Sequence, residues 1–230
     1  MKRALVSFEG PIGVGKSTLW TLLQSHLEKA FGKDKFAMCQ EPVEQWIEND
    51  ILRLSYEEPK LYSFPAQCVF FTSRIKHLRD QMVENKDVNL FISERSPFSD
   101  KMFWELKLKL EDVTPVLHKA YMDMWNLWQD LMPPDVRQPS LFIYLKASVD
   151  TCMARLKERN RDAEKTVGPD YQRALIEEHD NIFCSDYVYM PDGKTIPCIT
   201  VDAEVNYKDD PKELDKIATQ IIDKIKEVLG

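Results

Sequence analysis

The sequence of 230 residues has no long hydrophobic run, and its longest apolar stretches are far too short to cross a bilayer. We therefore expect no membrane-spanning helix and no membrane partner. The first apolar run starts almost at the N-terminus, which leaves no room for a signal or transit peptide. Together these features predict a cytoplasmic protein.

The sequence also has no long block of basic residues. Its 31 lysines and arginines are outnumbered by 38 aspartates and glutamates, which gives a net charge of −7. Because a phosphate backbone attracts clustered cations, this balance argues against a nucleic-acid partner. With 43% hydrophobic and 30% charged residues, the composition is typical of a soluble globular protein. The length suits a single domain, residues 1–230, with a full core.

Cysteine pairs and histidine clusters are missing as well. The number of cysteines, five, is odd, and no two of them form a C-x-x-C pair. We therefore expect reduced cysteines that pack in the protein interior. The four histidines are scattered without the spacing of metal ligands. Metal binding by histidine is therefore not expected.

Glycine is scarce too, with seven residues, but three of them fall in the stretch GPIGVGKST at positions 10–18. This stretch has the pattern G-x-x-x-x-G-K-S of a phosphate-binding loop. Glycines let backbone N–H groups turn towards an anion, and the N-terminus of a following helix adds partial positive charge. Lys16 is expected to reach the β- and γ-phosphates, and Ser17 to hold Mg²⁺. The residues expected at the phosphates are Gly10, Gly13, Val14, Gly15, Lys16, Ser17 and Thr18.

The residues on both sides of this loop fit a phosphate site. An apolar run at 3–8 predicts a buried strand, and leucines at helical spacing after residue 18 predict a helix. The alternative is a chance match on a glycine turn, which would not require a strand before the loop and a helix after it. We therefore predict that the chain binds a nucleoside triphosphate.

Carboxylates directly follow two further predicted strands. Glu41 comes after the apolar run 36–40, and Glu94 comes after the run 89–93 with Arg95 beside it. Open α/β sheets bind ligands at the C-terminal ends of their strands. There an acid could hold Mg²⁺ directly or through water, and an arginine could neutralise charge on a transferring phosphoryl group. The alternatives are a helix-start acid for Glu41 and an ordinary ion pair for Glu94 and Arg95. Two such acids beside a phosphate loop favour the functional interpretation.

A long helix is predicted over residues 61–83, and Gln67, Phe70 and Arg74 share one of its faces at positions i, i+3 and i+7. The polar pair could hydrogen-bond a flat heteroaromatic ring, since a glutamine offers both a donor and an acceptor to a base edge. The same residues could form a solvated stripe, and spacing alone favours the stripe.

Three arginines, Arg155, Arg159 and Arg161, lead into a polar stretch that ends at residues 168–169. Arg155 and Arg159 lie four residues apart on one helix face. This arrangement predicts a mobile lid, residues 159–168, that closes over phosphates. The alternative is a solvated basic face with acidic neighbours.

Further periodicity predicts helices over residues 43–55, 98–110, 115–131, 170–184 and 214–229, and strands over 141–145 and 196–201. The helix 115–131 carries a methionine and aromatic stripe that is typical of a core and also occurs at subunit contacts. Strands that alternate with helices predict an α/β protein with a parallel sheet of about five strands and helices on both faces. Pro197 suits an edge position for the last strand.

Three motifs taken together resemble those of the deoxynucleoside kinase family, which holds deoxycytidine, deoxyguanosine and mitochondrial-type thymidine kinases. They are E-P-V-x-x-W at 41–46, E-R-S at 94–96 and R-x-x-x-R-x-R at 155–161. The resemblance runs nearly end to end. It implies a P-loop kinase fold with an arginine-rich lid, ATP as the phosphate donor, Mg²⁺, and a homodimer through the helices around 98–132. The implied reaction phosphorylates the 5′-hydroxyl of a small-molecule deoxynucleoside.

The resemblance also implies roles at the reacting groups. Glu41 would be the base that faces the 5′-hydroxyl. Arg95 would touch that hydroxyl and the phosphates, with Lys16 as a second catalytic cation. Glu94 and Ser17 would serve Mg²⁺. The lid arginines implied at the ATP phosphates are Arg155, Arg159 and Arg161.

At the nucleoside, Gln67 would make a bidentate contact to the base edge, and Tyr56 and Glu164 would hold the sugar 3′-hydroxyl. Arg74 and Asp100 match a pair that in this family accompanies cytosine or purine substrates. The full set implied at the nucleoside is Glu41, Trp46, Tyr56, Gln67, Arg74, Arg95, Asp100, Trp104 and Glu164.

Three positions depart from the family pattern. Ala66 stands where many members have a phenylalanine that stacks on the base, and Phe70 stands where the cytidine kinases have a small residue. Trp104 stands where the family often has phenylalanine. With Arg74 and Asp100 present, we expect purine deoxynucleosides and deoxycytidine to be favoured over thymidine.

Two other functions share part of these features. A nucleoside monophosphate kinase of the thymidylate kinase type has the phosphate loop, the sheet and a lid. It needs cations for the acceptor's own phosphate, and Glu41 would face that phosphate unfavourably. A nucleotide-dependent switch or scaffold would not need a base-edge glutamine together with two acids at strand ends.

Overall fold

The computed structural model describes residues 3–133 and 137–230. Within them one six-stranded sheet has the order β2-β3-β1-β4-β6-β5. The five parallel strands are β1 (Ala4–Glu9), β2 (Phe36–Cys39), β3 (Leu90–Glu94), β4 (Leu141–Lys146) and β6 (Thr195–Asp202). Every residue of β1 and β3 is buried, as expected for parallel strands covered on both faces.

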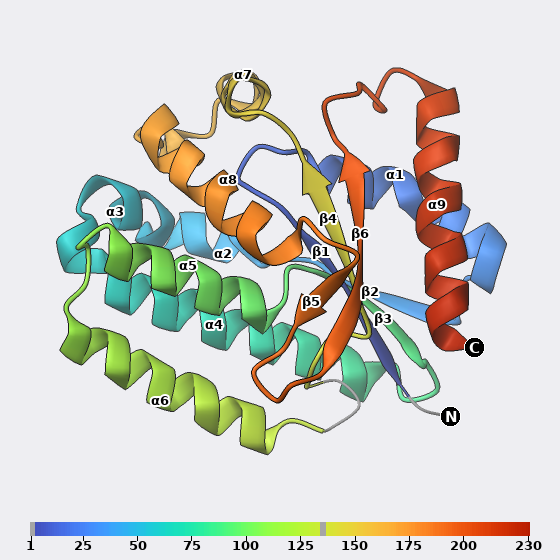
Figure 1. The fold of residues 1–230 in the computed structure, drawn as a ribbon, viewed down its shortest axis with the longest axis horizontal. Coiled ribbons are helices and arrows are strands. Elements are labelled where there is room, and N and C mark those ends of the chain that lie inside the picture. Colours follow the sequence, from blue (N-terminus) through green and yellow to red (C-terminus); the bar gives the residue numbers. More distant parts are fainter. Residues whose placement is uncertain (1–2, 134–136) are drawn as a thin grey trace.

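Helices cover both faces of the sheet (Figure 1). One face carries α1 (Lys16–Phe31) and α9 (Pro211–Leu229), and the other carries α4 (Pro59–Glu84), α5 (Pro97–Lys109) and α6 (Pro115–Leu131). The alternation of side chains along β1 divides these two cores. Val6 and Phe8 pack in the cluster that contains α1 and α9, whereas Leu5 packs in the cluster that contains Phe71 and Tyr121.

Other helices frame the end of the sheet where the strands finish. They are α2 (Val43–Glu48), α3 (Ile51–Glu57), α7 (Val149–Arg159) and the short 3₁₀ helix η1 (Asp162–Glu164). Helix α8 (Pro169–Phe183) leads away from them and packs Phe183 on Phe142 and Tyr144 of β4. Phe8 pairs with Glu94 and Cys39 pairs with Ser93, so β1, β2 and β3 end at one edge of the sheet. The loops that follow these strands therefore meet there.

The sheet has six strands, so the expectation of five was wrong. The additional strand, β5 (Tyr187–Tyr189), runs antiparallel to β6 and forms the edge. The predicted edge position of Pro197 is also wrong, because β6 has β4 on one side and β5 on the other, with Pro197 paired to Tyr187. Three residues are too few to display a strand period, which is why β5 escaped detection.

The helix predicted over residues 43–55 is two helices. Asp50 takes a left-handed conformation (φ 63°) between α2 and α3, which interrupts the helical hydrogen bonding. The helix 115–131 was predicted with the bounds that α6 has, and the helix 61–83 with bounds within two residues of those of α4.

All five cysteines are free. Cys39, Cys152 and Cys198 are buried as expected, but Cys184 is exposed. In the two described ranges, no helix offers the length and hydrophobicity that a bilayer crossing requires.

Candidate active site

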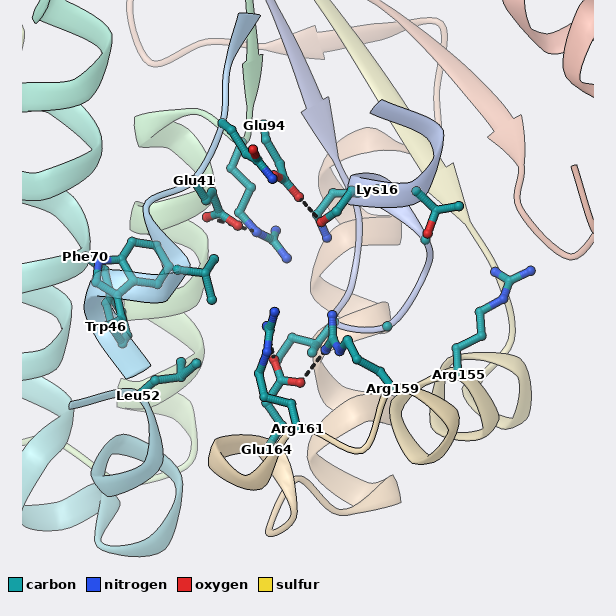
Figure 2. A pocket seen from close by; sticks show the side chains of 18 of the residues that line it. Lys16, Glu41, Trp46, Leu52, Phe70, Glu94, Arg155, Arg159, Arg161 and Glu164 are labelled. Atoms are coloured by element: carbon teal, nitrogen blue, oxygen red, sulfur yellow. Dashed lines mark hydrogen bonds and ion pairs between the residues drawn. The ribbon is translucent and has the colours of Figure 1, made fainter. Parts of the chain in front are cut away.

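A cavity of about 900 Å³ opens at the sheet edge where β1, β2 and β3 end. Most of the residues singled out in the sequence line it, and Figure 2 shows many of them pointing into it from opposite sides. The predicted residues that line the cavity are Gly13, Gly15, Lys16, Ser17, Thr18, Glu41, Trp46, Tyr56, Gln67, Arg74, Glu94, Arg95, Asp100, Arg155, Arg159, Arg161 and Glu164. The stretches 10–18, 41–46, 94–100 and 155–164 are thus brought together from distant parts of the chain.

The phosphate loop is built from backbone that only glycine adopts easily. Gly13 has φ +78° and Gly15 has φ +104°. A Cβ at Gly13 would lie 2.6 Å from the carbonyl oxygen of Cys152, and one at Gly15 would lie 2.3 Å from Tyr207 Oη. Helix α1 begins directly after this loop, at Lys16, so its N-terminal N–H groups face the cavity edge. The loop therefore has the form of an anion cradle.

Lys16 is buried beneath this loop. Its Nζ donates hydrogen bonds of 2.9 Å to the carbonyl oxygens of Gly10 and Pro11. Burial, together with the nearby charge of Arg95, lowers the pKa of Lys16 to about 7. Gly10 and Val14 do not line the cavity, and they act within the loop through their carbonyl groups.

Ser17 and Glu94 meet at the phosphate end of the cavity. Ser17 Oγ donates a hydrogen bond of 2.6 Å to Glu94 Oε1. Burial and the neighbouring Glu41 raise the pKa of Glu94, although Ser17 and Lys16 act in the opposite direction. A hydroxyl and a carboxylate oxygen are hard ligands that fit Mg²⁺ when phosphate oxygens and water complete the shell. No cluster of three or more histidine, cysteine or acidic residues suited to a metal occurs among residues 3–133 and 137–230.

The opposite end of the cavity carries a chain of ion pairs. Arg74 donates from Nη2 to Glu41 and from Nη1 to Asp100, and Arg95 Nε lies 3.6 Å from Glu41 Oε1. Gln67 Nε2 donates to Asp100 Oδ1 at 2.9 Å and to the Asp100 carbonyl at 3.2 Å. Because Gln67 is buried and Arg74 is paired with both carboxylates, the expectation of a solvated stripe on α4 was wrong.

These ion pairs set the charge of the two carboxyl groups. Burial alone would raise the pKa of Glu41, but Arg74, Arg95 and Lys16 outweigh it, so that its pKa lies below the usual value. Burial raises the pKa of Asp100 to about 6 despite the adjacent Arg74. Glu41 is therefore an ionised carboxylate at neutral pH, with two arginines beside it.

Arg95 stands on a strained turn between β3 and α5. It is one of only four residues other than glycine with positive φ in the described ranges, at +69°. Its backbone N–H donates to the Phe8 carbonyl at 2.9 Å. Its guanidinium lies 4.8 Å from the centre of the Phe103 ring. This turn directs the Arg95 side chain towards Glu41 and the cavity.

The wall beside Gln67 is aromatic. The Trp46 and Phe70 rings lie 4.6 Å apart, and Trp46 Nε1 donates to Ser73 Oγ at 2.9 Å. The small residue Ala66 lines the same region of the cavity. Ser63, one turn before Gln67, also lines it with a buried hydroxyl that makes no hydrogen bond to any described residue.

The three arginines expected at the lid differ in their hydrogen bonds. Arg159 and Arg161 both donate to Glu164, as Figure 2 shows. The bond from Arg161 Nη1 measures 3.2 Å. Arg155 instead donates from Nη1 to the carbonyl oxygens of Val14 and Ala203, each at 2.8 Å. Arg155 thus braces the phosphate loop in addition to lining the cavity.

Trp104 is the one residue expected at the nucleoside that the structure does not bring to the cavity. Its side chain is fully buried in the core, in contact with Tyr121 and stacked on His118. On α5 the cavity is lined by residues 100, 103 and 107, at i, i+3 and i+7. Trp104 therefore faces α6, and its expected contact with the nucleoside has no support from the geometry.

Some cavity residues escaped the sequence analysis. Phe103 and Lys107 share a helix face with Asp100, so the spacing on α5 could have identified them. Residues 205–209 carry no motif, and yet Tyr207 Oη donates to the Gly15 carbonyl at 3.0 Å across 192 positions of sequence. No local signal could have found that contact.

Comparison with known proteins is consistent with this site. The deoxynucleoside kinase family model matches residues 6–227. The chain is 28% identical to the probable deoxycytidine kinase of fowlpox virus, over 97% of this chain and 88% of that protein. It is 26% identical to a deoxyguanosine kinase of Lactobacillus johnsonii, over 97% of this chain and 93% of that protein.

Among solved structures, a deoxyadenosine kinase from M. mycoides with the products dCMP and a flexible dCDP superposes with a TM-score of 0.71. The identity is 24%, over 97% of this chain and 99% of that chain. This likeness shows that the two chains share a fold.

Proposed function

The chain belongs to the deoxynucleoside kinase family, and we propose that it uses Mg·ATP to phosphorylate the 5′-hydroxyl of a deoxynucleoside, with purine deoxynucleosides and deoxycytidine favoured over thymidine. The observation that carries the proposal is Arg74, which joins Glu41 to Asp100 and Gln67 across the cavity from the phosphate loop. Arg74 thus holds both the Glu41 carboxylate, which suits the acceptor hydroxyl, and the Asp100 carboxylate beside Gln67, which suits the edge of a base.

Glu41 is the group that orients the acceptor hydroxyl. Phosphoryl transfer passes through a loose transition state in which the nucleophile keeps its proton until late. Glu41 then has to accept one hydrogen bond and finally one proton, and a carboxylate with a lowered pKa can do both. Arg95, 3.6 Å from Glu41 through Nε, stabilises charge that develops on the transferring group.

The donor phosphates lie at the opposite end, in the cradle of residues 10–18. Lys16 supplies a cation there, and the phosphate charge favours its protonated form. Ser17 and Glu94 would hold Mg²⁺, which neutralises charge on the phosphate oxygens when it is bound. Arg159 and Arg161 of the lid, residues 159–168, would close over the same phosphates, while Tyr56 and Glu164 would bind the sugar 3′-hydroxyl.

Base preference follows from the orientation of Gln67. Its Nε2 faces two acceptors of Asp100, so its Oε1 points the other way and accepts hydrogen bonds. Adenine, cytosine and guanine each carry an exocyclic amino group that can donate to that oxygen, whereas thymine has none. Phe70, supported by Trp46, offers a face for stacking, and the small Ala66 leaves room for a larger base.

The test is steady-state kcat/KM with Mg·ATP for deoxyadenosine, deoxyguanosine, deoxycytidine and thymidine. Deoxyadenosine monophosphate and thymidylate are assayed in parallel. We expect turnover of a purine nucleoside or deoxycytidine above that of thymidine. Dominant thymidine turnover would overturn the preference, and turnover of monophosphates alone would favour a thymidylate kinase type of enzyme.

A homodimer is part of the proposal. Helix α6 exposes Val116, Leu127 and Leu131, with 78%, 58% and 74% of each residue accessible, which is unusual for an amphipathic helix of a monomer. Family resemblance puts a dimer contact at residues 98–132. Light scattering should give twice the chain mass for the native protein, and Leu127→Glu with Leu131→Glu should yield a monomer.

A further inference from the structure

Glu9, the last residue of β1, is a fully buried carboxylate that the mechanism above does not use. Three serine hydroxyls donate to it. Ser7 and Ser96 both donate to Oε1 at 2.7 Å, and Ser99 donates to Oε2. No ion pair joins Glu9 to a basic residue in the described ranges. A carboxylate is costly to bury, and here hydroxyls and a helix end compensate for the lost water.

Two of these serines belong to the turn that carries Arg95. Ser96 follows Arg95 directly and is the N-cap of α5, and Ser99 lies in its first turn. Ser99 Oγ also accepts from the Ser96 N–H at 3.4 Å. The N-terminus of α5 adds partial positive charge next to the Glu9 carboxylate. Glu9 is therefore the anchor of the segment immediately after Arg95.

Strand β1 also holds Arg95, the residue immediately before Ser96. The Arg95 N–H donates to the Phe8 carbonyl, so two successive residues of β1 grip Arg95 and Ser96. Arg95 has a positive φ, which its side chain makes unfavourable and which surrounding contacts must enforce. The residue after Glu9 is Gly10, whose carbonyl accepts from Lys16 at 2.9 Å. One end of β1 thus connects the phosphate loop to the arginine turn.

We infer that Glu9 is a positioning residue: through Ser96 and Ser99 it fixes the strained Arg95 turn at a set distance from the phosphate loop. The inference deepens the proposed function, since it assumes that Arg95 acts in phosphoryl transfer. Displacement of a catalytic group by about 1 Å can reduce turnover by about 10²-fold. A network that holds Arg95 therefore affects kcat although it touches no substrate.

The experiment compares serines that share the same carboxylate. Ser96→Ala with Ser99→Ala removes the hydroxyls on the Arg95 turn, whereas Ser7→Ala removes one hydroxyl on β1 itself. We expect the double variant to lower kcat by about 30-fold with the nucleoside KM changed by less than about threefold. Ser7→Ala should leave kcat within about threefold of the native value. Thermal unfolding of each variant reports any general loss of structure.

The decisive measurement repeats the double substitution in an Arg95→Ala background. If the network acts through Arg95, the two serine changes cause no further loss of kcat there. A full additional 30-fold loss in that background would overturn the inference, and so would an unchanged kcat with a lowered melting temperature in the native background.

Ser99→Ala alone answers the same question if the double variant does not fold, with Ser99→Thr as the variant that keeps the hydroxyl and should retain kcat. Loss of kcat in both single variants would overturn the inference. Absence of nucleoside kinase activity in the native protein would instead refute the proposed function, before any variant is compared.

Discussion

The two ends of the cavity are built in different ways. The phosphate end is made mainly of backbone, with glycines at positive φ and the N-terminus of α1. The nucleoside end is made of side chains, with Arg74 between Glu41 and Asp100. Backbone groups recognise any phosphate, whereas side chains can be exchanged to fit one base. This division suits the proposed reaction, in which ATP binds at one end and a deoxynucleoside at the other.

The electrostatics of the two ends differ in the same way. At the nucleoside end, arginine charges lower the pKa of Glu41 against the effect of burial, whereas burial prevails at Asp100 and raises its pKa to about 6. At the phosphate end, burial dominates, raising the pKa of Glu94 and lowering that of Lys16 to about 7. The nucleoside end thus carries its own counter-charges. The phosphate end has charged groups whose ionised forms gain most from a ligand that brings charge of its own.

The nucleoside end should depend most strongly on Glu41. Glu41→Gln keeps the shape but removes the proton acceptor and the charge between two arginines. We expect kcat to fall by about 10³-fold while nucleoside binding stays measurable by calorimetry. Glu48→Gln, an exposed glutamate on α2, is the control and should be near native. Turnover close to native in Glu41→Gln would remove Glu41 from the mechanism.

A single added methyl group should disrupt phosphate binding at the phosphate end. Gly15→Ala would put a Cβ 2.3 Å from Tyr207 Oη at a φ of +104°. We expect kcat/KM for ATP to fall by about 10²-fold, with nucleoside binding nearly unchanged. Gly32→Ala also sits at positive φ, +96°, but at the far end of α1, and it controls for backbone strain alone. Equal losses in both variants would mean that strain, not the cradle, sets the effect.

Arg74 should determine the pH at which Glu41 works. Arg74→Met removes the nearest cation that lowers the pKa of Glu41, so this pKa rises towards and above its usual value. The acid limb of the kcat profile should then move to higher pH by about one unit. At neutral pH Glu41 stays ionised, so a fall of kcat by about 10-fold there should come from the lost hydrogen bond by which Arg74 orients Glu41. Arg79→Met, on the exposed side of α4, is the matched control. An unmoved acid limb would show that Arg74 does not act on Glu41.

Sequence reasoning succeeded where the signal was local. The loop 10–18, the acids after β2 and β3, and the shared face of Gln67 and Arg74 each follow from residues a few positions apart. The cavity residues Arg155, Arg159 and Arg161 were found in the same way, and their closing as a lid stays a prediction. These features account for most of the cavity lining.

The failures have a common physical origin in tertiary contacts. Tyr207 supports Gly15 from the far end of the chain, and β5 exists because its three residues pair with β6. Glu9 carried no motif of its own, since its partners Ser96 and Ser99 lie about 90 positions away. The direction of the Arg74 side chain, to solvent or to Glu41, likewise depends on tertiary packing. The spacing of residues along α4 does not contain that information.

Trp104 is the sharpest example, because resemblance put it at the nucleoside and the structure puts it in the core. Trp104→Phe removes ring area packed on Tyr121 and His118, so we expect the free energy of unfolding to fall by roughly 1–3 kcal/mol. At 25 °C kcat/KM for every nucleoside should stay within about twofold of native, since no cavity contact is lost. Phe70→Ala is the contrasting aromatic change, and it should alter nucleoside KM with little effect on stability because Phe70 lines the cavity. If Trp104→Phe changes the base preference and Phe70→Ala does not, Trp104 contacts the nucleoside after all.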